Sequence, residues 1–241
     1  MLKSKLVLLA LASGLIASCF AADNAVEANI RKLVAPRLSE GAKIESVKET
    51  PYGGLYEVRV GNSVFYTDKK GEYLIQGHIF NTRSAEDLTQ LRLDDLNKIR
   101  FSELPFENAV KLVKGDGKRV MAIFEDPNCG YCKKFRQNAL KDVTNVTVYT
   151  FMYNILSPDS AVRSRNIWCS ADRNKAWDEW MVDGKAAPAA PAKCESPNDE
   201  VAALGHRLGI NATPQLFFAD GSRIAGAIDT AALEAKFKSI K

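Results

Sequence analysis

Val120-Met121-Ala122-Ile123-Phe124 leads into Cys129-Gly130-Tyr131-Cys132 near the middle of the chain. The apolar run is typical of a buried β-strand, and two cysteines at this spacing can close into a small ring with each other. If a helix begins at the motif, the first sulfur faces solvent at the helix N-terminus, where the helix dipole favours its thiolate. Such a thiolate exchanges disulfides with other proteins, so the sequence predicts a redox-active dithiol.

The two cysteines have different expected roles. Cys129 is the candidate nucleophile, which attacks a substrate disulfide as a thiolate and gives a mixed disulfide. In motifs of this kind the first thiol has a pKa of roughly 3.5–7.5. Cys132 lies one helical turn inward and is the candidate resolving thiol, which releases adducts that fail to rearrange. Gly130 and Tyr131 are candidate substrate contacts that tune the redox potential, and neither supplies a cationic group.

Residues 1–21 have the pattern of a signal peptide. Two lysines precede an apolar stretch over residues 6–17, and small residues follow up to a cleavage site after Ala21. The apolar stretch is too short to span a bilayer. Cys19 and the three residues before it also resemble a bacterial lipoprotein box, which would leave a lipidated Cys19 as the first residue. Simple cleavage is favoured because no flexible Ser/Gly tether follows Cys19, and the predicted location is the periplasm.

Removal of this leader leaves four cysteines, and an even number in an oxidising compartment suggests two disulfides. The CxxC pair is the reactive candidate, whereas Cys169 and Cys194, separated by a long loop, look structural. The alternative is a zinc site formed by all four sulfurs. Zinc is disfavoured because Cys169 and Cys194 do not form a second CxxC motif. The sequence therefore predicts neither a metal nor a cofactor.

The charge balance argues against two classes of partner. The chain has 33 Lys and Arg residues against 29 Asp and Glu residues, a formal net charge of +4. The leader holds two lysines and no acids, so its removal lowers the net charge to about +2. Without a block of basic residues, this balance indicates neither nucleic-acid binding nor attraction to an anionic membrane surface.

Residues 22–83 are predicted to form a small α+β domain. A helix over residues 25–34 is followed by short alternating runs with turn residues between them. The expected strands cover residues 43–48, 55–60, 64–67 and 73–79. A domain of this size has a small core and exposed strand edges, so pairing with a second copy would stabilise it. It is therefore predicted to be a dimerisation domain.

Residues 84–100 are predicted to form a linker helix. Ser84-Ala85-Glu86-Asp87 has the form of a capping box. Apolar residues then recur on one helix face, namely Leu88, Leu91, Leu96 and Ile99. Sixteen helical residues would span about 24 Å. The alternative is an ordinary amphipathic helix packed on either domain.

Residues 101–241 are predicted to form the catalytic domain. The expected elements are a strand from about 107, a strand at 119–125, the CxxC helix to about 140, a strand at 146–154, a helical stretch at 157–183, a helix near 198–209, a hairpin from 215 to 228 and a helix at 231–240. This order is the thioredoxin arrangement with a helical insertion, and the predicted fold class of the whole chain is α+β.

Thr213-Pro214 is the second functional element of this domain. A proline just before a strand, far downstream of a CxxC motif, suggests the cis-proline of thioredoxin folds. A cis bond would place the Thr213 backbone beside Cys129, where an extended substrate could add as a strand. The alternative is a trans proline that opens an edge strand. The cis form is favoured because of the order in which the two motifs occur.

Further short segments accompany these motifs: Phe124, Asp126, Ile167-Trp168-Cys169, Asp172, Asn174-Lys175-Ala176, Ala203-Leu204-Gly205 and Ile75-Gln76-Gly77. Together they make the chain resemble the DsbC family of bacterial periplasmic disulfide isomerases over essentially its full length. The resemblance implies a V-shaped homodimer, joined through cystatin-like N-terminal domains, with linker helices that hold two thioredoxin-like domains across an open cleft. It also implies a permanent Cys169–Cys194 disulfide and a CxxC pair kept reduced by a membrane reductase of the DsbD type.

Two features bear on how far the resemblance extends. Thioredoxins carry a buried acid six residues before the first cysteine, but Ile123 occupies that place here and the proton acceptor for Cys132 is unassigned. Glu125 is a candidate, although its position on the strand indicates a surface or loop-edge carboxylate. The related DsbG type usually has proline in place of Gly130, so Gly130 favours the DsbC type.

The predicted function is therefore a dimeric enzyme that reshuffles incorrect disulfides in exported proteins. One alternative is a holdase chaperone that binds unfolded chains in a dimer cleft, with the thiols secondary. Another is a DsbG-like reductase that protects single cysteines. A monomeric oxidant is disfavoured because a dimer would hide the CxxC motif from an oxidising membrane partner.

Overall fold

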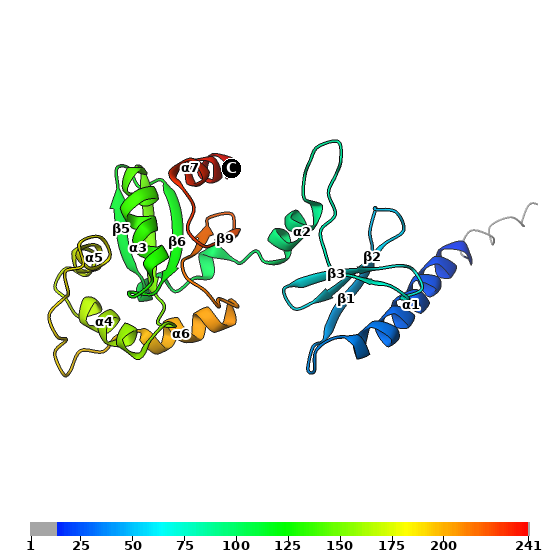
Figure 1. Cartoon of the computed structure of the whole chain (residues 1–241), viewed down its shortest axis with the longest axis horizontal. Helices are drawn as coiled ribbons and strands as arrows, with labels where there is room; N and C mark the ends of the chain where they lie inside the picture. Colours follow the sequence, from blue (N-terminus) through cyan, green and yellow to red (C-terminus); the bar gives the residue numbers. More distant parts are fainter. Residues whose placement is uncertain (1–13, 241) are drawn as a thin grey trace, which may run out of the picture. The chain divides into compact units, whose positions relative to one another are not determined.

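A computed structural model describes residues 14–240, and the part of the predicted signal peptide before Gly14 lies outside these residues. The chain divides into two compact units, with the division between Leu96 and Asn97. Both units combine helices with sheets, which confirms the predicted α+β class (Figure 1). Among the described residues, no helix is both long and apolar enough to cross a bilayer.

The first unit is a four-stranded antiparallel sheet with one long helix packed on it. The sheet has the strand order β1 (Ile44–Glu49), β2 (Tyr56–Val60), β3 (Ser63–Thr67) and β4 (Leu74–Ile75). Helix α1 (Gly14–Val34) is followed by a short 3-10 turn, η1 (Ala35–Arg37). Helix and sheet share a small apolar core of Ile30, Val34, Ile44, Val47, Tyr56 and Val58.

The fourth strand is shorter than the sequence predicts. A strand is expected over residues 73–79, but only Leu74 and Ile75 pair with β3. The chain then leaves the sheet, and the backbone N–H of Ile79 donates to the hydroxyl of Thr89 instead of to a strand (2.9 Å). Phe80 forms a single bridge with Asp87 across the loop that follows.

The predicted linker helix over residues 84–100 is also shorter. Helix α2 covers Leu88–Leu96, nine residues, or about 13.5 Å. The capping residue is Asp87 rather than Ser84, because the Asp87 carboxylate accepts from the N–H of Gln90 (2.9 Å), whereas Ala85 has a left-handed φ of 58° that a helix cannot include. At the other end, Ile99 already belongs to the second unit, and its N–H donates to the carbonyl of Gly221 in that unit (2.9 Å) instead of continuing the helix.

The second unit contains a five-stranded sheet with the order β5-β7-β6-β8-β9. Its strands are β5 (Val110–Lys114), β6 (Arg119–Glu125), β7 (Val146–Met152), β8 (Gln215–Phe218) and β9 (Arg223–Ala225). Strands β6 and β7 are parallel, and the other pairs are antiparallel. The central strand β6 leads directly to the CxxC motif, which is the thioredoxin arrangement that the sequence predicts.

Helices cover both faces of this sheet. They are α3 (Gly130–Phe135) with its π-helical continuation η4 (Arg136–Leu140), α4 (Pro158–Trp168), α5 (Arg173–Asp178) with the π-helical segment η5 (Glu179–Asp183), α6 (Asn198–Arg207) and α7 (Thr230–Ser239). Two 3-10 turns, η2 (Phe101–Glu103) and η3 (Phe106–Asn108), precede β5. Helices α4 to α6 form the predicted insertion between β7 and β8.

The alternation of side chains along β6 produces two apolar layers. Met121 and Ile123 pack on one face with residues of η4 and α7, and Ala122 and Phe124 pack on the other with residues of α6 and β7. All four side chains are fully buried. The strand that carries the motif is therefore fixed from both sides, which sets the position of Cys129 at its end.

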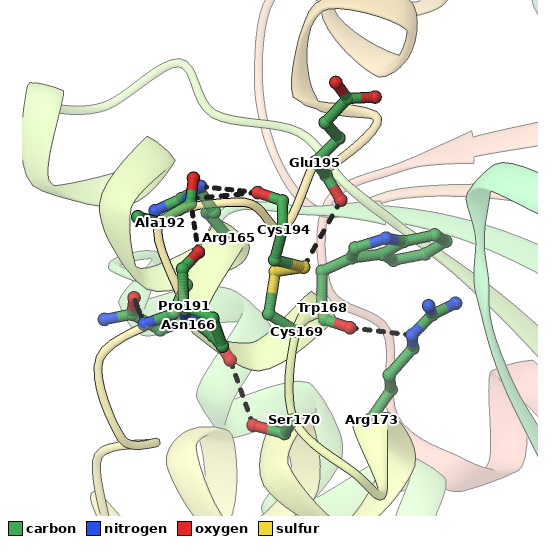
Figure 2. The surroundings of a disulfide bond; sticks show 11 residues. Arg165, Asn166, Trp168, Cys169, Ser170, Arg173, Pro191, Ala192, Cys194 and Glu195 are labelled. Carbon is green, nitrogen blue, oxygen red and sulfur yellow. Dashed lines mark hydrogen bonds between the residues drawn. A yellow bond between two sulfur atoms is a disulfide. The ribbon is translucent and has the colours of Figure 1, made fainter.

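Cys169 and Cys194 form a disulfide that joins the end of α4 to the Pro/Ala-rich loop (Figure 2). Their Cα atoms are 6.2 Å apart, and the bond closes a loop of sequence separation 25. Arg165 supports the same loop, because its guanidinium donates to the carbonyl oxygens of Cys194 (2.9 Å) and Pro191 (2.8 Å). The bond uses two of the four sulfurs that a four-cysteine zinc site would need.

We expect the double substitution Cys169→Ala and Cys194→Ala to lower the free energy of unfolding by about 3 kcal/mol, because the opened loop gains conformational freedom in the unfolded chain. Urea unfolding with the CxxC pair kept reduced measures the difference. The rate of alkylation of Cys129 should stay unchanged, since the disulfide closes a different loop. An unchanged urea midpoint would contradict a stabilising role.

Candidate active site

Helix α3 begins at the CxxC motif, and Cys129 itself is the N-cap residue. Cys129 has extended backbone angles (φ −76°, ψ 113°), and its Sγ accepts the N–H of Cys132 (3.2 Å). The carbonyl of Cys129 accepts the N–H of Lys133, which starts the helical hydrogen-bond pattern (3.1 Å). A sulfur in the N-cap position receives an otherwise unpaired helix donor, and negative charge there is favoured by the helix dipole.

Cys129 is less open to solvent than the sequence suggests. The exposed fraction of Cys129 is 4%, so the residue is buried and the expectation that its sulfur faces solvent is wrong. The covering segment is the loop before β8, where the Thr213–Pro214 peptide bond is cis and the carbonyl oxygen of Thr213 lies 3.3 Å from Cys129 Sγ. A residue 84 positions away in sequence thus lies against the sulfur.

The pKa of Cys129 is lowered to about 6. The main cause is the hydrogen bond from the Cys132 side chain, joined by the backbone N–H groups of Cys132 and Tyr131, while burial opposes the effect. With a pKa near 6, about nine in ten Cys129 sulfurs are thiolates at pH 7. The nucleophile is therefore present in its reactive form without a separate base.

The pKa of Cys132 is shifted in the opposite direction. Its side chain has no exposed surface, and burial raises the pKa of its thiol far above the usual range, with further contributions from Cys129 and the charge of Glu125. Both cysteines are free thiols in this structure. The structure thus presents one activated sulfur at the surface end of the motif and one fully protonated sulfur behind it.

Glu125 corrects a prediction from the sequence. It is not a surface or loop-edge carboxylate, because its exposed fraction is 0%. Its Oε2 accepts from Arg136 Nε (2.7 Å) and from the indole N–H of Trp177 (3.3 Å). Arg136 is itself buried and donates also to the hydroxyl of Thr150 (2.7 Å). The carboxylate points inward because these partners lie on the helix and insertion that cover the end of β6.

Asp126 is a second buried carboxylate next in sequence. Its Oδ2 accepts the N–H groups of Ile155 (2.8 Å) and Leu156 (2.9 Å) after β7. Its Oδ1 accepts from the N–H of Asn128 and from the hydroxyl of Ser160, both at 2.8 Å. Asp126 therefore ties the turn before Cys129 to the start of the helical insertion.

Trp180 also stabilises the turn before Cys129. The indole N–H of Trp180 donates to the carbonyl of Pro127 (2.7 Å). Lys133 and Arg163 lie near the Trp180 ring, with Nζ and Cζ at 4.2 and 4.0 Å from its centroid. Residues 126–128 are thus held by hydrogen bonds and ring contacts before the chain reaches Cys129.

The remaining predicted site residues lie around the first sulfur. Tyr131 is 69% exposed, and the space beside Gly130, where a side chain would begin, is open. Thr213 and Pro214 lie on the other side of Cys129. The structure therefore brings Cys129, Cys132 and the Thr213–Pro214 bond together, while Cys169 and Cys194 belong to a separate bridge.

The sequence reasoning missed Arg136 as a functional candidate. The available signal is its spacing, because Arg136 follows Cys132 by four residues and therefore lies on the same helix face. What the sequence does not show is that Glu125 and Trp177 meet it there. Within residues 14–240, no group of three His, Cys, Asp or Glu side chains is placed to hold a metal ion. The chemistry of the site is that of the two thiols.

Comparisons with known proteins agree with this geometry. Residues 21–90 match the family of disulfide bond isomerase protein N-terminal domains, and residues 106–241 match thioredoxin-like domains. A probable thiol:disulfide interchange protein DsbC from Bordetella pertussis is 47% identical over 197 residues, which cover 82% of this chain and 69% of that protein. The thiol:disulfide interchange protein DsbC from Escherichia coli K12 is 28% identical over 210 residues, covering 85% and 82%.

A solved structure gives the same result for part of the chain. The disulfide interchange protein from Neisseria gonorrhoeae superposes with a TM-score of 0.53 and 38% identity, covering 56% of this chain and 97% of that one. Both the sequence match over most of the chain and the dithiol beside a cis-proline support one assignment. The chain belongs to the DsbC family of thiol:disulfide interchange proteins.

Proposed function

We propose that this protein is a periplasmic disulfide isomerase in which Cys129 attacks substrate disulfides and Cys132 resolves the adducts. The observation that carries the proposal is the unequal state of the two thiols. Cys129 has a pKa lowered to about 6 and lies at a helix start beside the Thr213 carbonyl, whereas Cys132 is buried with a raised pKa. A low-pKa sulfur both attacks and leaves readily, which shuffling of disulfides requires.

The isomerisation cycle conserves electrons. The Cys129 thiolate forms a bond to one substrate sulfur, the substrate disulfide breaks, and its other sulfur leaves as a thiolate. That thiolate attacks a different disulfide of the same substrate. A substrate thiolate finally attacks the mixed disulfide and displaces the Cys129 thiolate. When this last step fails, Cys132 attacks Cys129 Sγ, the substrate leaves reduced, and the CxxC pair becomes a disulfide.

The substrate side of the site is formed by the backbone next to the cis-proline. Strand β8 begins directly after Pro214, so an extended substrate segment can lie beside Thr213 and reach the sulfur. Tyr131, exposed beside the motif, offers an aromatic surface to the same segment. The substrates are exported proteins with incorrect disulfides, and a membrane reductase of the DsbD type would return the oxidised CxxC pair to the dithiol.

The first unit supports assembly into a homodimer. Among its side chains from Asn24 onwards, six large apolar ones are exposed, namely Leu33, Tyr73, Leu74, Ile75, Phe80 and Leu91. Both residues of β4 are exposed at the edge of the sheet, where a further strand can pair. The small core of this unit would gain apolar burial from a second copy.

Recovery of activity by scrambled ribonuclease in glutathione buffer tests the proposed function. We expect the mature protein to speed the return of ribonuclease activity and the Cys129→Ala variant to add nothing to the rate in buffer alone, because the remaining thiol of Cys132 is buried and protonated. Insulin reduction without ribonuclease recovery would instead indicate a DsbG-like reductase. Suppression of aggregation that survives loss of both Cys129 and Cys132, with no catalysis in either assay, would indicate a holdase.

The reactivity of Cys129 should depend on pH in a defined direction. Because its pKa is lowered to about 6, the thiolate is present above pH 6 and is lost as the pH falls below it. Alkylation of the reduced native protein by iodoacetamide should therefore reach a plateau near neutral pH and fall about tenfold per unit below the midpoint. The Cys132→Ala variant removes the main hydrogen-bond donor and should move the midpoint upward. A wild-type midpoint near 8.5, the value of an ordinary thiol, would contradict the described geometry.

Sedimentation of the mature protein tests the dimer. At micromolar concentration we expect a dimer, and Ile75→Asp should shift it towards monomer because a carboxylate at the β4 edge opposes burial. Val162→Asp, at a side chain that is 58% exposed in the second unit, is the matched control and should leave the mass unchanged. A monomeric wild-type protein would rule out the proposed assembly.

A further inference from the structure

We infer that Glu125 accepts the proton of the Cys132 thiol when Cys132 resolves a mixed disulfide. This inference rests on the proposed function, because it concerns the step that releases a trapped adduct. Cys132 cannot attack as a thiol, and its burial disfavours spontaneous ionisation. A base must therefore lie within the same buried region, and water has no direct access to the sulfur.

Glu125 is positioned for this role by two hydrogen-bond partners. Arg136, which binds Glu125 Oε2 at 2.7 Å, follows Cys132 by one helical turn and lies on the same helix face. Trp177, which donates to the same oxygen at 3.3 Å, packs in one apolar cluster with Cys132. The carboxylate and the thiol thus share their neighbours, and the charge of Glu125 acts directly on Cys132.

One oxygen of the carboxylate is unoccupied. Glu125 Oε1 is buried and has no hydrogen-bond partner, although Oε2 has two. A buried acceptor without a donor is costly, so its presence calls for a role or a donor that arrives during the reaction. The thiol proton of Cys132 is such a donor.

The charges around Glu125 leave it able to gain and lose a proton. Burial raises the pKa of Glu125, and the guanidinium of Arg136 opposes that shift and favours the carboxylate. Asp178 adds a smaller effect in the raising direction from α5, where it lies 4.0 Å from Arg136. A carboxylate with a raised pKa accepts a proton more readily than an ordinary surface carboxylate does.

Arg136, the ionic partner of Glu125, lies next to solvent-accessible space. Together with Asp178 and Lys114 it lines a surface pocket of about 560 Å³. Glu125 itself is fully buried, so one residue separates its carboxylate from this pocket.

The step balances as written. Cys132 Sγ gives its proton to Glu125 Oε1, and the thiolate attacks Cys129 Sγ of the mixed disulfide. The Cys129–Cys132 bond forms, the bond from Cys129 to the substrate sulfur breaks, and that sulfur leaves as a thiolate with the electron pair. The CxxC pair is oxidised, the substrate sulfur is reduced, and Glu125 loses its proton to solvent.

Stopped-flow reaction of the reduced protein with dithiobis(nitrobenzoate) separates the two steps. The first release of nitrothiobenzoate reports attack by Cys129, and the second reports attack by Cys132 on the resulting mixed disulfide. In Glu125→Gln we expect the second phase to slow at least about tenfold at pH 7 and to accelerate as pH rises, because hydroxide replaces the lost base. The first phase should be unchanged.

A double variant separates proton transfer from charge balance. Glu125→Gln alone removes the close counter-charge of the buried Arg136 and leaves only Asp178 at 4.0 Å, which can disturb folding or the thiol. Glu125→Gln with Arg136→Gln removes both charges, and its second phase should remain slow. Recovery of the wild-type second phase in this double variant would overturn the inference. If the double variant does not fold, Glu125→Asp is the fallback variant. If the rate of its second phase then depends on pH as the rate of an uncatalysed thiol does, the inference is overturned.

A matched control and a separate readout complete the design. Glu234 pairs with Arg119 in the same unit, away from the motif, so Glu234→Gln should leave both phases unchanged. A second phase that depends on Glu125 in a protein that fails with scrambled ribonuclease would refute the proposed function but not this inference. Ribonuclease recovery by the wild-type protein, together with an unchanged second phase in Glu125→Gln and in the double variant, would refute this inference but not the proposed function.

Discussion

The hydrogen bond from the N–H of Cys132 to the sulfur of Cys129 is the contact on which the rest of the site depends. It exists because β6 ends at Glu125 and helix α3 begins with Cys129 as its N-cap. The same helical turn that exposes one sulfur to unpaired N–H donors carries the other sulfur into the core. The pKa of Cys129 is lowered mainly by the hydrogen bond from the Cys132 side chain, to which the backbone N–H of Cys132 adds, whereas burial raises the pKa of Cys132.

Two adjacent buried carboxylates connect this turn to the helical insertion. Asp126 accepts from neutral donors after β7 and from α4, whereas one oxygen of Glu125 accepts from the charged Arg136 and from Trp177 of α5. Neighbouring strand residues point to opposite faces, so the pair contacts different parts of the insertion. The insertion is thereby attached to the active site through polar groups that would be costly to leave unpaired.

The sequence predicts elements best where the signal is local. The apolar run predicts a strand over 119–125, and β6 has those bounds. The spacing of the cysteines predicts the start of α3, and the order of the motifs along the chain predicts the place of Pro214 beside them. The sequence-based prediction fails where residues far away in the sequence determine whether a side chain is buried. The burial of Glu125 depends on Arg136 and on Trp177, 52 residues away, and the low exposure of Cys129 depends on Thr213, 84 residues away. Likewise Ser84 satisfies the pattern of a cap, but the left-handed backbone of Ala85 moves the helix start to Leu88.

The unequal thiols also set the time available for rearrangement. A mixed disulfide on Cys129 persists until a substrate thiolate or Cys132 attacks it, and burial of Cys132 keeps that thiol protonated for most of the time. Substrate thiols in solution have a pKa closer to ambient pH and so compete well for the same bond. A resolving sulfur that waits for a proton acceptor therefore favours isomerisation over reduction. The burial that makes Cys132 a slow nucleophile is then part of the mechanism, since a freely ionised thiol in its place would end each encounter before the substrate had rearranged.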